Sequence, residues 1–242
     1  MKIKYFLYLI SFVLIIELTL RVIGFGNPVI YKKTENNFFP EKNQKLRRFL
    51  GSEININSKG MRTNFNWNEK EDIKILFFGD SVTFGGSFVD NNDLFSENLC
   101  QLIENSVCGN YAVNGYHLNN MIQRINNVNN EIEFNKLIIF VSSSFKNDNS
   151  NFSDFPFYQK YDKVILKASN EIINHFLFKY KIVDNYHSKK KEKEVYDNIS
   201  QSKLKIEFLN LINNLKKEKE IFIFILPTLE DFEKKRYGYN FF

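Results

Sequence analysis

A serine stands directly after an apolar run in this chain, where its hydroxyl could act as a nucleophile. The run Ile73–Phe78 is followed by Gly79, Asp80 and Ser81. An apolar run that ends at a glycine predicts a parallel strand buried on both faces. The carboxyl end of such a strand is where α/β sheets bind their ligands, and Gly79 is expected to allow the sharp backbone path there. The alternative is a loop in which Asp80 or Ser81 only caps the next helix.

The elements that must position this serine alternate between strand and helix patterns. We expect strands over residues 74–78, 110–113, 137–141 and 221–226, and helices over 93–105, 118–132, 164–182 and 201–217. This alternation predicts an α/β fold with a right-handed, mostly parallel sheet. The polar, aromatic stretch 142–162 is long for a loop in a compact domain, which makes it a candidate functional segment.

The amino terminus has the layout of a signal anchor. Lys2 and Lys4 precede twelve uncharged residues, 5–16, a basic start followed by an apolar core. Twelve residues span about 18 Å as a helix, short of the roughly 30 Å hydrocarbon layer. We therefore expect a transmembrane helix over 1–26 that takes in Glu17 and Arg21, with an interfacial or buried helix as the alternative. With the two lysines inside, the rest of the chain would face outward from the cytoplasm.

Three regions follow from these patterns. The anchor over 1–26 is followed by a connector over 27–72, which lacks a sustained period, and by the α/β domain over 73–242. The net charge of +5 is a mild excess. Much of it lies in the mixed-sign run 189–194, which favours a solvated loop over a nucleic-acid groove. We therefore expect no nucleic-acid partner.

Cysteine and histidine usage favours neither a disulfide framework nor a metal site. The two cysteines are Cys100, in an expected helix, and Cys108, near an expected strand. We expect two buried thiols rather than a bridge. The histidines His117, His175 and His187 lack paired ligand spacing. No metal and no cofactor is expected.

Three blocks that follow three successive strands carry a resemblance to a known family, the SGNH (GDSL-type) hydrolases. The blocks are Phe78-Gly79-Asp80-Ser81-Val82-Thr83-Phe84-Gly85, Asn110-Tyr111-Ala112-Val113-Asn114-Gly115-Tyr116 and Ser142-Ser143-Ser144-Phe145-Lys146-Asn147-Asp148. The third keeps Asn-Asp but lacks the family's preceding glycine. Two further segments are similar to membrane-anchored bacterial members: Glu17-Leu18-Thr19-Leu20-Arg21 and Asn57-Ser58-Lys59-Gly60-Met61-Arg62.

The resemblance implies a three-layer, flavodoxin-like fold and a set of site residues. It assigns the nucleophile to Ser81. It assigns the oxyanion donors to the backbone N–H groups of Ser81 and Gly115 and to the side-chain amide of Asn147. It makes Asp80 a brace for the turn rather than the catalytic acid. The alternatives are a simple turn glycine at Gly115 and an Asx turn at Asn147.

The family's general base is missing from its expected place. The family carries an Asp-x-x-His block after its last strand, and no such block follows residues 221–226 here. Asp184 and His187 have this spacing but precede that strand, and His117 more plausibly starts a helix. We expect the α/β fold to be incomplete at its carboxyl end. The chain is then either a truncated hydrolase or an inactive relative.

These observations favour a serine ester hydrolase, membrane-anchored through its amino-terminal helix, that acts on small-molecule or carbohydrate acyl or acetyl esters outside the cytoplasm. One alternative is a polysaccharide O-acetyltransferase of the same fold that uses the same serine. The other is a non-catalytic, membrane-tethered relative that has lost the base.

Overall fold

The centre of the molecule is a parallel four-stranded sheet. The computed structural model describes residues 2–22, 28–34, 37–48, 52–67, 71–86, 88–142 and 198–226. The sheet has the order β6-β5-β7-β8, and each neighbouring pair is parallel. Its strands are β5 (Ile73–Phe78), β6 (Ser106–Asn110), β7 (Lys136–Ser142) and β8 (Glu220–Leu226). The first strand of the sheet therefore lies between the second and third, as in doubly wound flavodoxin-like sheets.

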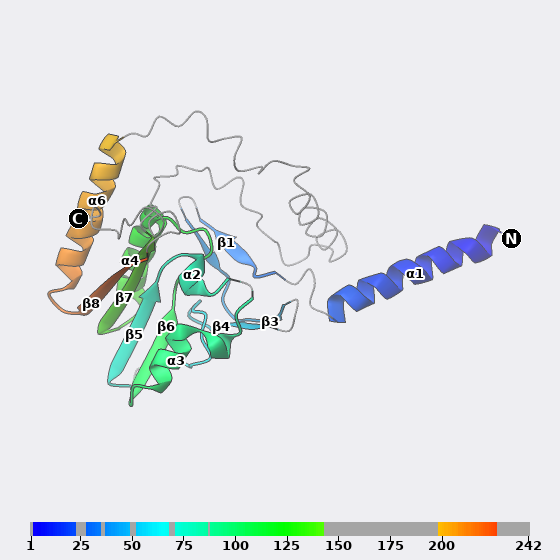
Figure 1. The fold of residues 1–242 in the computed structure, drawn as a ribbon, viewed down its shortest axis with the longest axis horizontal. Coiled ribbons are helices and arrows are strands. Elements are labelled where there is room, and N and C mark those ends of the chain that lie inside the picture. The colour runs from blue at the N-terminus through cyan, green and yellow to red at the C-terminus, as the bar shows by residue number, and fades with distance from the viewer. Residues whose placement is uncertain are drawn as a thin grey trace, which may run out of the picture.

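Helices cover both faces of this sheet (Figure 1). They are α2 (Ser81–Phe84), α3 (Phe95–Gln101), α4 (Leu118–Glu131) and α6 (Asn198–Leu215), with the 3₁₀ turn η2 (Asn91–Asp93) before α3. Leu76 and Phe78 of β5 share one core with α4 and α6. Ile75 and Phe77 point to the opposite face, in a second core that includes Cys100 of α3. Because alternate residues of β5 are buried on both sides, the α/β prediction is confirmed.

Several element boundaries differ from the sequence prediction. The expected helix over 93–105 is shorter, because Leu102 caps α3 and Asn105 turns the chain with φ 53°. The expected strand over 110–113 begins earlier, as β6. Residues after β6 still run beside β5, since the Tyr111 N–H donates to the Phe77 carbonyl at 2.8 Å. The helix expected over 164–182 lies outside the described residues.

The region expected as a connector forms two hairpins. They are β1 (Tyr31–Lys33) with β2 (Phe38–Pro40), and β3 (Gln44–Arg47) with β4 (Glu53–Ile56). Ile54 and Ile56 of β4 pack in a cluster with Phe84 of α2 and Ala112. This region is therefore packed against the turn that carries Ser81.

The two cysteines form a disulfide, which corrects the prediction of two thiols. The Cα atoms of Cys100 and Cys108 lie 5.8 Å apart, within disulfide range. The prediction failed because the chain reverses between α3 and β6, which brings the end of the helix against the strand.

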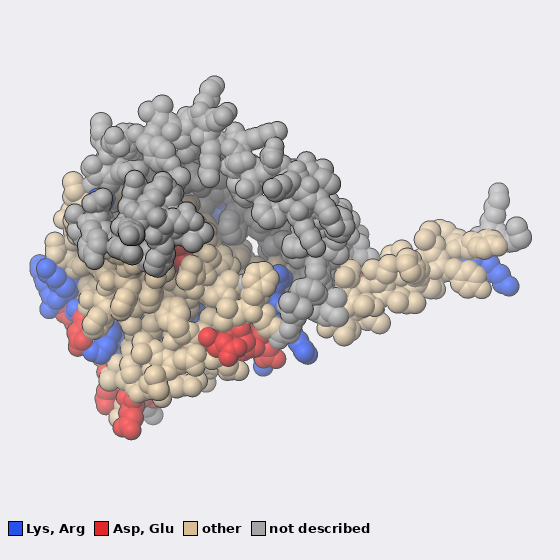
Figure 2. All heavy atoms as spheres, viewed as in Figure 1, with Lys and Arg blue, Asp and Glu red and all other residues tan. Residues whose placement is uncertain are grey.

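The amino-terminal helix is α1 (Lys2–Val22). In Figures 1 and 2 it extends away from the sheet and is uncharged along most of its length. Tyr5, Leu9 and Phe12 are among its many exposed apolar side chains. Within the described residues, no helix has the length and apolarity required to cross a membrane. The predicted transmembrane span over 1–26 is therefore not confirmed.

Candidate active site

Ser81 lies where the direction of strand addition reverses. β6 is added on one side of β5 and β7 on the other. In open α/β sheets, the crevice beyond the carboxyl ends of the strands at such a point is where ligands bind. Ser81 is the first residue of α2 and is separated from the end of β5 by two residues, Gly79 and Asp80; it is exposed.

Asp80 is the helix cap, which leaves the serine hydroxyl uncommitted. The Val82 N–H donates to Asp80 Oδ1 at 2.9 Å, as expected for an N-cap residue. Ser81 Oγ makes no hydrogen bond with the residues that the structure describes. The capping alternative is therefore correct for Asp80. The same geometry holds Ser81 open to solvent.

Position 79 requires a glycine because α2 packs where a Cβ would lie. Its φ is not in the left-handed region, where the structure places Gly60, Gly85, Gly86 and Gly115. A Cβ at Gly79 would lie 2.1 Å from Thr83 Oγ1 and 2.6 Å from Thr83 Cβ. The first turn of α2 therefore lies directly on the Gly79 backbone. Gly79 thus makes room for the turn by its missing Cβ rather than by a left-handed φ.

Gly115 lies in the turn that follows β6, beside the serine turn. Its φ of 78° favours glycine, and the Tyr116 N–H closes the turn on the Val113 carbonyl at 3.2 Å. The Val113 N–H donates to the Gly79 carbonyl at 3.2 Å, which joins the two blocks directly. Gly115 is thus a turn glycine, and it is also exposed at the same edge of the sheet as Ser81.

Two backbone donors at this edge are unused. Neither the Ser81 N–H nor the Gly115 N–H donates a hydrogen bond to any residue in the described part of the chain. The first N–H groups of a helix lack intrahelical partners, which explains the free donor at Ser81. Free backbone N–H groups of this kind can stabilise a developing oxyanion.

Buried polar side chains that sequence reasoning missed support both turns. The Asn110 amide is 1% exposed, and it donates to the Thr83 carbonyl of α2 at 2.7 Å. Asn114 Nδ2 lies 3.2 Å from the Tyr31 hydroxyl of β1, and burial raises the pKa of Tyr31 to about 12. Asn110 is the last residue of β6, and a polar residue that ends a mostly apolar strand is the sequence signal for this role.

Of the remaining candidate residues, His117 begins a helix and the others lie outside the described residues. His117 is the N-cap of α4, and its N–H donates to Asn120 Oδ1 at 3.1 Å, as expected for a helix start. Asn147, Asp184 and His187 lie outside the described residues. Among the described residues, no imidazole or carboxylate contacts Ser81 Oγ, and no cluster of metal-ligating side chains occurs.

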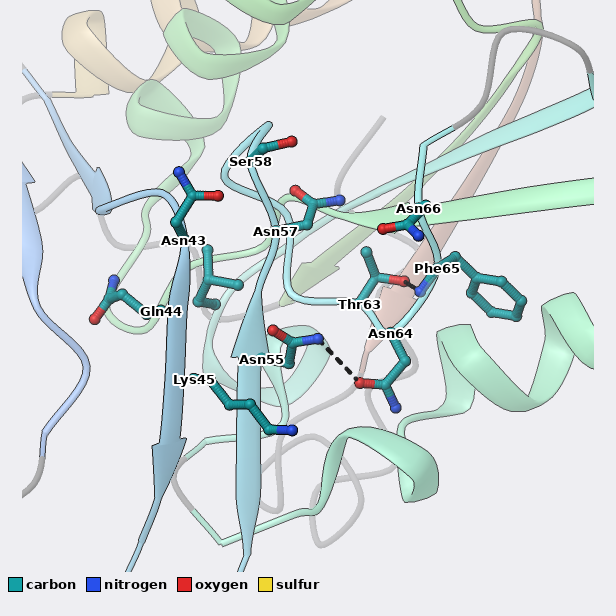
Figure 3. Close-up of a pocket in the computed structure, with 11 residues that line it drawn as sticks. Asn43, Gln44, Lys45, Asn55, Asn57, Ser58, Thr63, Asn64, Phe65 and Asn66 are labelled. Carbon is teal, nitrogen blue, oxygen red and sulfur yellow. Dashed lines mark hydrogen bonds between the residues drawn. The ribbon is translucent and has the colours of Figure 1, made fainter.

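A polar pocket of about 330 Å³ lies between the β3–β4 hairpin and the segment after it (Figure 3). Side-chain amides dominate its wall, and Asn55 Nδ2 donates to Asn64 Oδ1 at 3.4 Å. Neither Ser81 nor Gly115 lines this pocket. It is therefore separate from the candidate active site.

Several solved structures are similar to this chain. No family model and no curated protein matches the chain. One of these solved structures is a member of the lipolytic protein G-D-S-L family from Veillonella parvula DSM 2008, with 16% sequence identity and a TM-score of 0.33. The match covers 62% of this chain and 57% of that chain.

Proposed function

We propose that the protein is a serine ester hydrolase of the GDSL type, with Ser81 as its nucleophile. One observation carries the proposal. An uncommitted serine hydroxyl lies at the carboxyl edge of the sheet, and the N–H groups of Ser81 and Gly115 are unused in the two turns that the Val113–Gly79 hydrogen bond joins. Ester hydrolysis needs these groups together: a hydroxyl that attacks, and preorganised donors for the oxyanion that forms.

The reaction would proceed in two steps. Ser81 Oγ bonds to the ester carbonyl carbon, and the carbonyl electrons move onto the oxygen, where the two backbone N–H groups bind the negative charge. The carbonyl re-forms as the ester C–O bond breaks, and the alcohol leaves with the proton that the serine released. Water then attacks the acyl-serine carbonyl in the same way, which releases the carboxylic acid and restores the serine hydroxyl. The serine proton must pass to a general base. No described residue lies where this base would act. The side-chain amide of Asn147, which lies outside the described residues, would be a third oxyanion donor.

We place the domain outside the cytoplasm and in contact with a membrane through α1. The Cys100–Cys108 disulfide supports the first part, because structural disulfides persist in oxidising compartments. The exposed apolar side chains of α1 support the second. Cell fractionation with accessibility of the domain to added protease tests both parts. Recovery of the intact chain in the soluble cytoplasmic fraction would refute them.

The absence of a base on Ser81 within the described residues also fits a non-catalytic relative. A fluorophosphonate probe separates the two functions, because it reacts only with an activated serine. We expect labelling of the full chain, loss of labelling in Ser81→Ala, and retention in the control Ser58→Ala, which alters another exposed serine. Hydrolysis of p-nitrophenyl acetate should follow the same pattern.

Folded full-length protein that is neither labelled nor active on this ester would refute the hydrolase function. It would favour the non-catalytic relative. Acetyl transfer to an added sugar at a higher rate than to water would instead identify the acetyltransferase alternative.

A further inference from the structure

The helix that carries Ser81 is only one turn long and cannot hold its own shape. α2 spans Ser81–Phe84, and an isolated turn of helix is unstable in water because its nucleation is unfavourable. Its last carbonyl groups also lack intrahelical partners. Residues from elsewhere in the chain must therefore fix this turn.

Arg62 binds the carboxyl end of this turn. Its Nη1 donates to the Phe84 carbonyl at 2.6 Å and to the Gly86 carbonyl at 2.8 Å. Nη2 donates to the Val89 carbonyl, and Nε donates to Asn91 Oδ1 at 3.0 Å. The planar guanidinium thus binds several acceptors of one loop at once, which an ammonium group cannot do with the same geometry.

The burial of Arg62 is unusual for a charged residue. Its side chain is 0% exposed, and every hydrogen bond it donates among the described residues goes to a neutral oxygen. Burial lowers the pKa of Arg62 to about 10, so the side chain stays charged at neutral pH. Asp90 and Glu97 attract this cation, but neither carboxylate accepts a hydrogen bond from it, and burying a cation in this way is costly. The hydrogen bonds that Arg62 donates offset part of this cost, and they also fix the loop.

The bonds lead from Arg62 to Ser81 in two steps. Gly86, whose carbonyl binds Arg62, donates its N–H to the Ser81 carbonyl at 3.0 Å. The Gly85 N–H donates to the same carbonyl at 3.0 Å. The Arg62 N–H also binds the Asn110 carbonyl at 2.9 Å, and the Asn110 side chain binds α2.

We propose that Arg62 is a positioning residue for Ser81, which fixes the direction of its hydroxyl and its backbone N–H through α2. This inference rests on the proposed function of Ser81. In the sequence, Arg62 is noticeable only as the last residue of the segment 57–62, which is similar to membrane-anchored bacterial members of the family. Through these contacts the segment takes part in the candidate active site. Small displacements of a nucleophile matter, since a misplacement of about 1 Å can slow an enzyme about 100-fold.

The test compares Arg62→Lys with the matched control Arg124→Lys in the full chain. Arg124 is also buried, but its guanidinium stacks on the rings of Phe39 and Tyr111, and it makes no hydrogen bond to α2 among the described residues. We expect Arg62→Lys to lower kcat for p-nitrophenyl acetate, and the fluorophosphonate labelling rate of folded protein, about 10- to 100-fold. KM should change less than about threefold, and the control should keep both rates within about threefold.

A second measurement does not depend on catalysis. Amide hydrogen exchange at Phe84, Gly85 and Gly86 should accelerate at least about tenfold in Arg62→Lys, while exchange in β5 stays unchanged. If Arg62→Lys does not fold, Asn110→Ala should give the same local acceleration, because it frees the Thr83 carbonyl. Unchanged exchange at these three amides would overturn the positioning role, even if Ser81 proves unreactive. Faster exchange in an unreactive protein would retain it and refute only the hydrolase function.

Discussion

Gly79→Ala should push α2 away from β5. The new Cβ would lie 2.1 Å from Thr83 Oγ1 and 2.6 Å from Thr83 Cβ, whereas non-bonded carbon atoms pack at about 3.5–4.0 Å. Rotation of the Thr83 side chain removes the first contact but leaves the second, because Cβ does not move with χ1. The backbone of α2 must therefore shift by about 1 Å.

The cost of this shift can be bounded. Overpacking in a core costs about 1–3 kcal/mol, and we expect Gly79→Ala to lower the free energy of unfolding by that amount. In a Thr83→Ala background the closest contact becomes 2.6 Å, to Cβ. The penalty should therefore fall but not vanish. Urea unfolding of the two single variants and the double variant measures this coupling.

A second glycine provides the control. A Cβ at Gly109 would lie 2.3 Å from Met61 Sδ, but the methionine side chain has several rotatable bonds and can move away. Gly109→Ala should therefore destabilise less than Gly79→Ala and leave Ser81 labelling unchanged. Equal costs for the two variants, or an unaltered labelling rate in folded Gly79→Ala, would refute the close packing of α2 on β5.

Two further predictions concern buried groups outside the turn. Reduction of the Cys100–Cys108 disulfide, or the Cys100→Ser/Cys108→Ser double variant, should lower the free energy of unfolding by about 2.5 kcal/mol, since the bridge closes a loop with a sequence separation of 8. Urea unfolding with and without reductant measures this loss. An unfolding midpoint that is the same with and without reductant would contradict it. Glu97 is 2% exposed and accepts the Asn64 N–H at 3.1 Å, and burial raises its pKa above the ordinary 4.5. Glu97 therefore binds its proton more tightly in the folded state than in the unfolded state. The wild type should lose stability relative to Glu97→Gln as the pH rises from about 4.5 through the raised pKa. A stability difference between the two proteins that stays constant over this range would contradict the raised pKa of Glu97.

Sequence patterns predicted much of the sheet because its strands are rich in apolar residues, and β5 and β7 are buried on both faces. The apolar runs at β5, β7 and β8 are continuous, and α4 has a clear apolar stripe. The hairpins of residues 31–56 were missed because their strands are three or four residues long, too short for alternation to appear. The disulfide was missed for a local reason, the chain reversal at Asn105.

The candidate nucleophile was predictable from the sequence, but the residues that hold it in place were not. Ser81 follows an apolar strand, and that order is visible in the sequence. Asn110 and Arg62 act through hydrogen bonds to backbone carbonyls of α2. Such acceptors exist in every residue, so no spacing in the sequence identifies which carbonyl a distant side chain binds.

The hairpin region and the serine turn depend on one another. Arg62 follows β4 and pairs with Ile56 in an antiparallel bridge, so the position of its guanidinium depends on the β3–β4 hairpin. Tyr31 of the other hairpin contacts Asn114, which precedes Gly115. Each of the two candidate oxyanion donors is therefore braced by a different hairpin. The residues expected to link an anchor to a domain instead form part of the scaffold of the candidate active site. A domain cut at residue 73 would keep Ser81 but lose the groups that hold it.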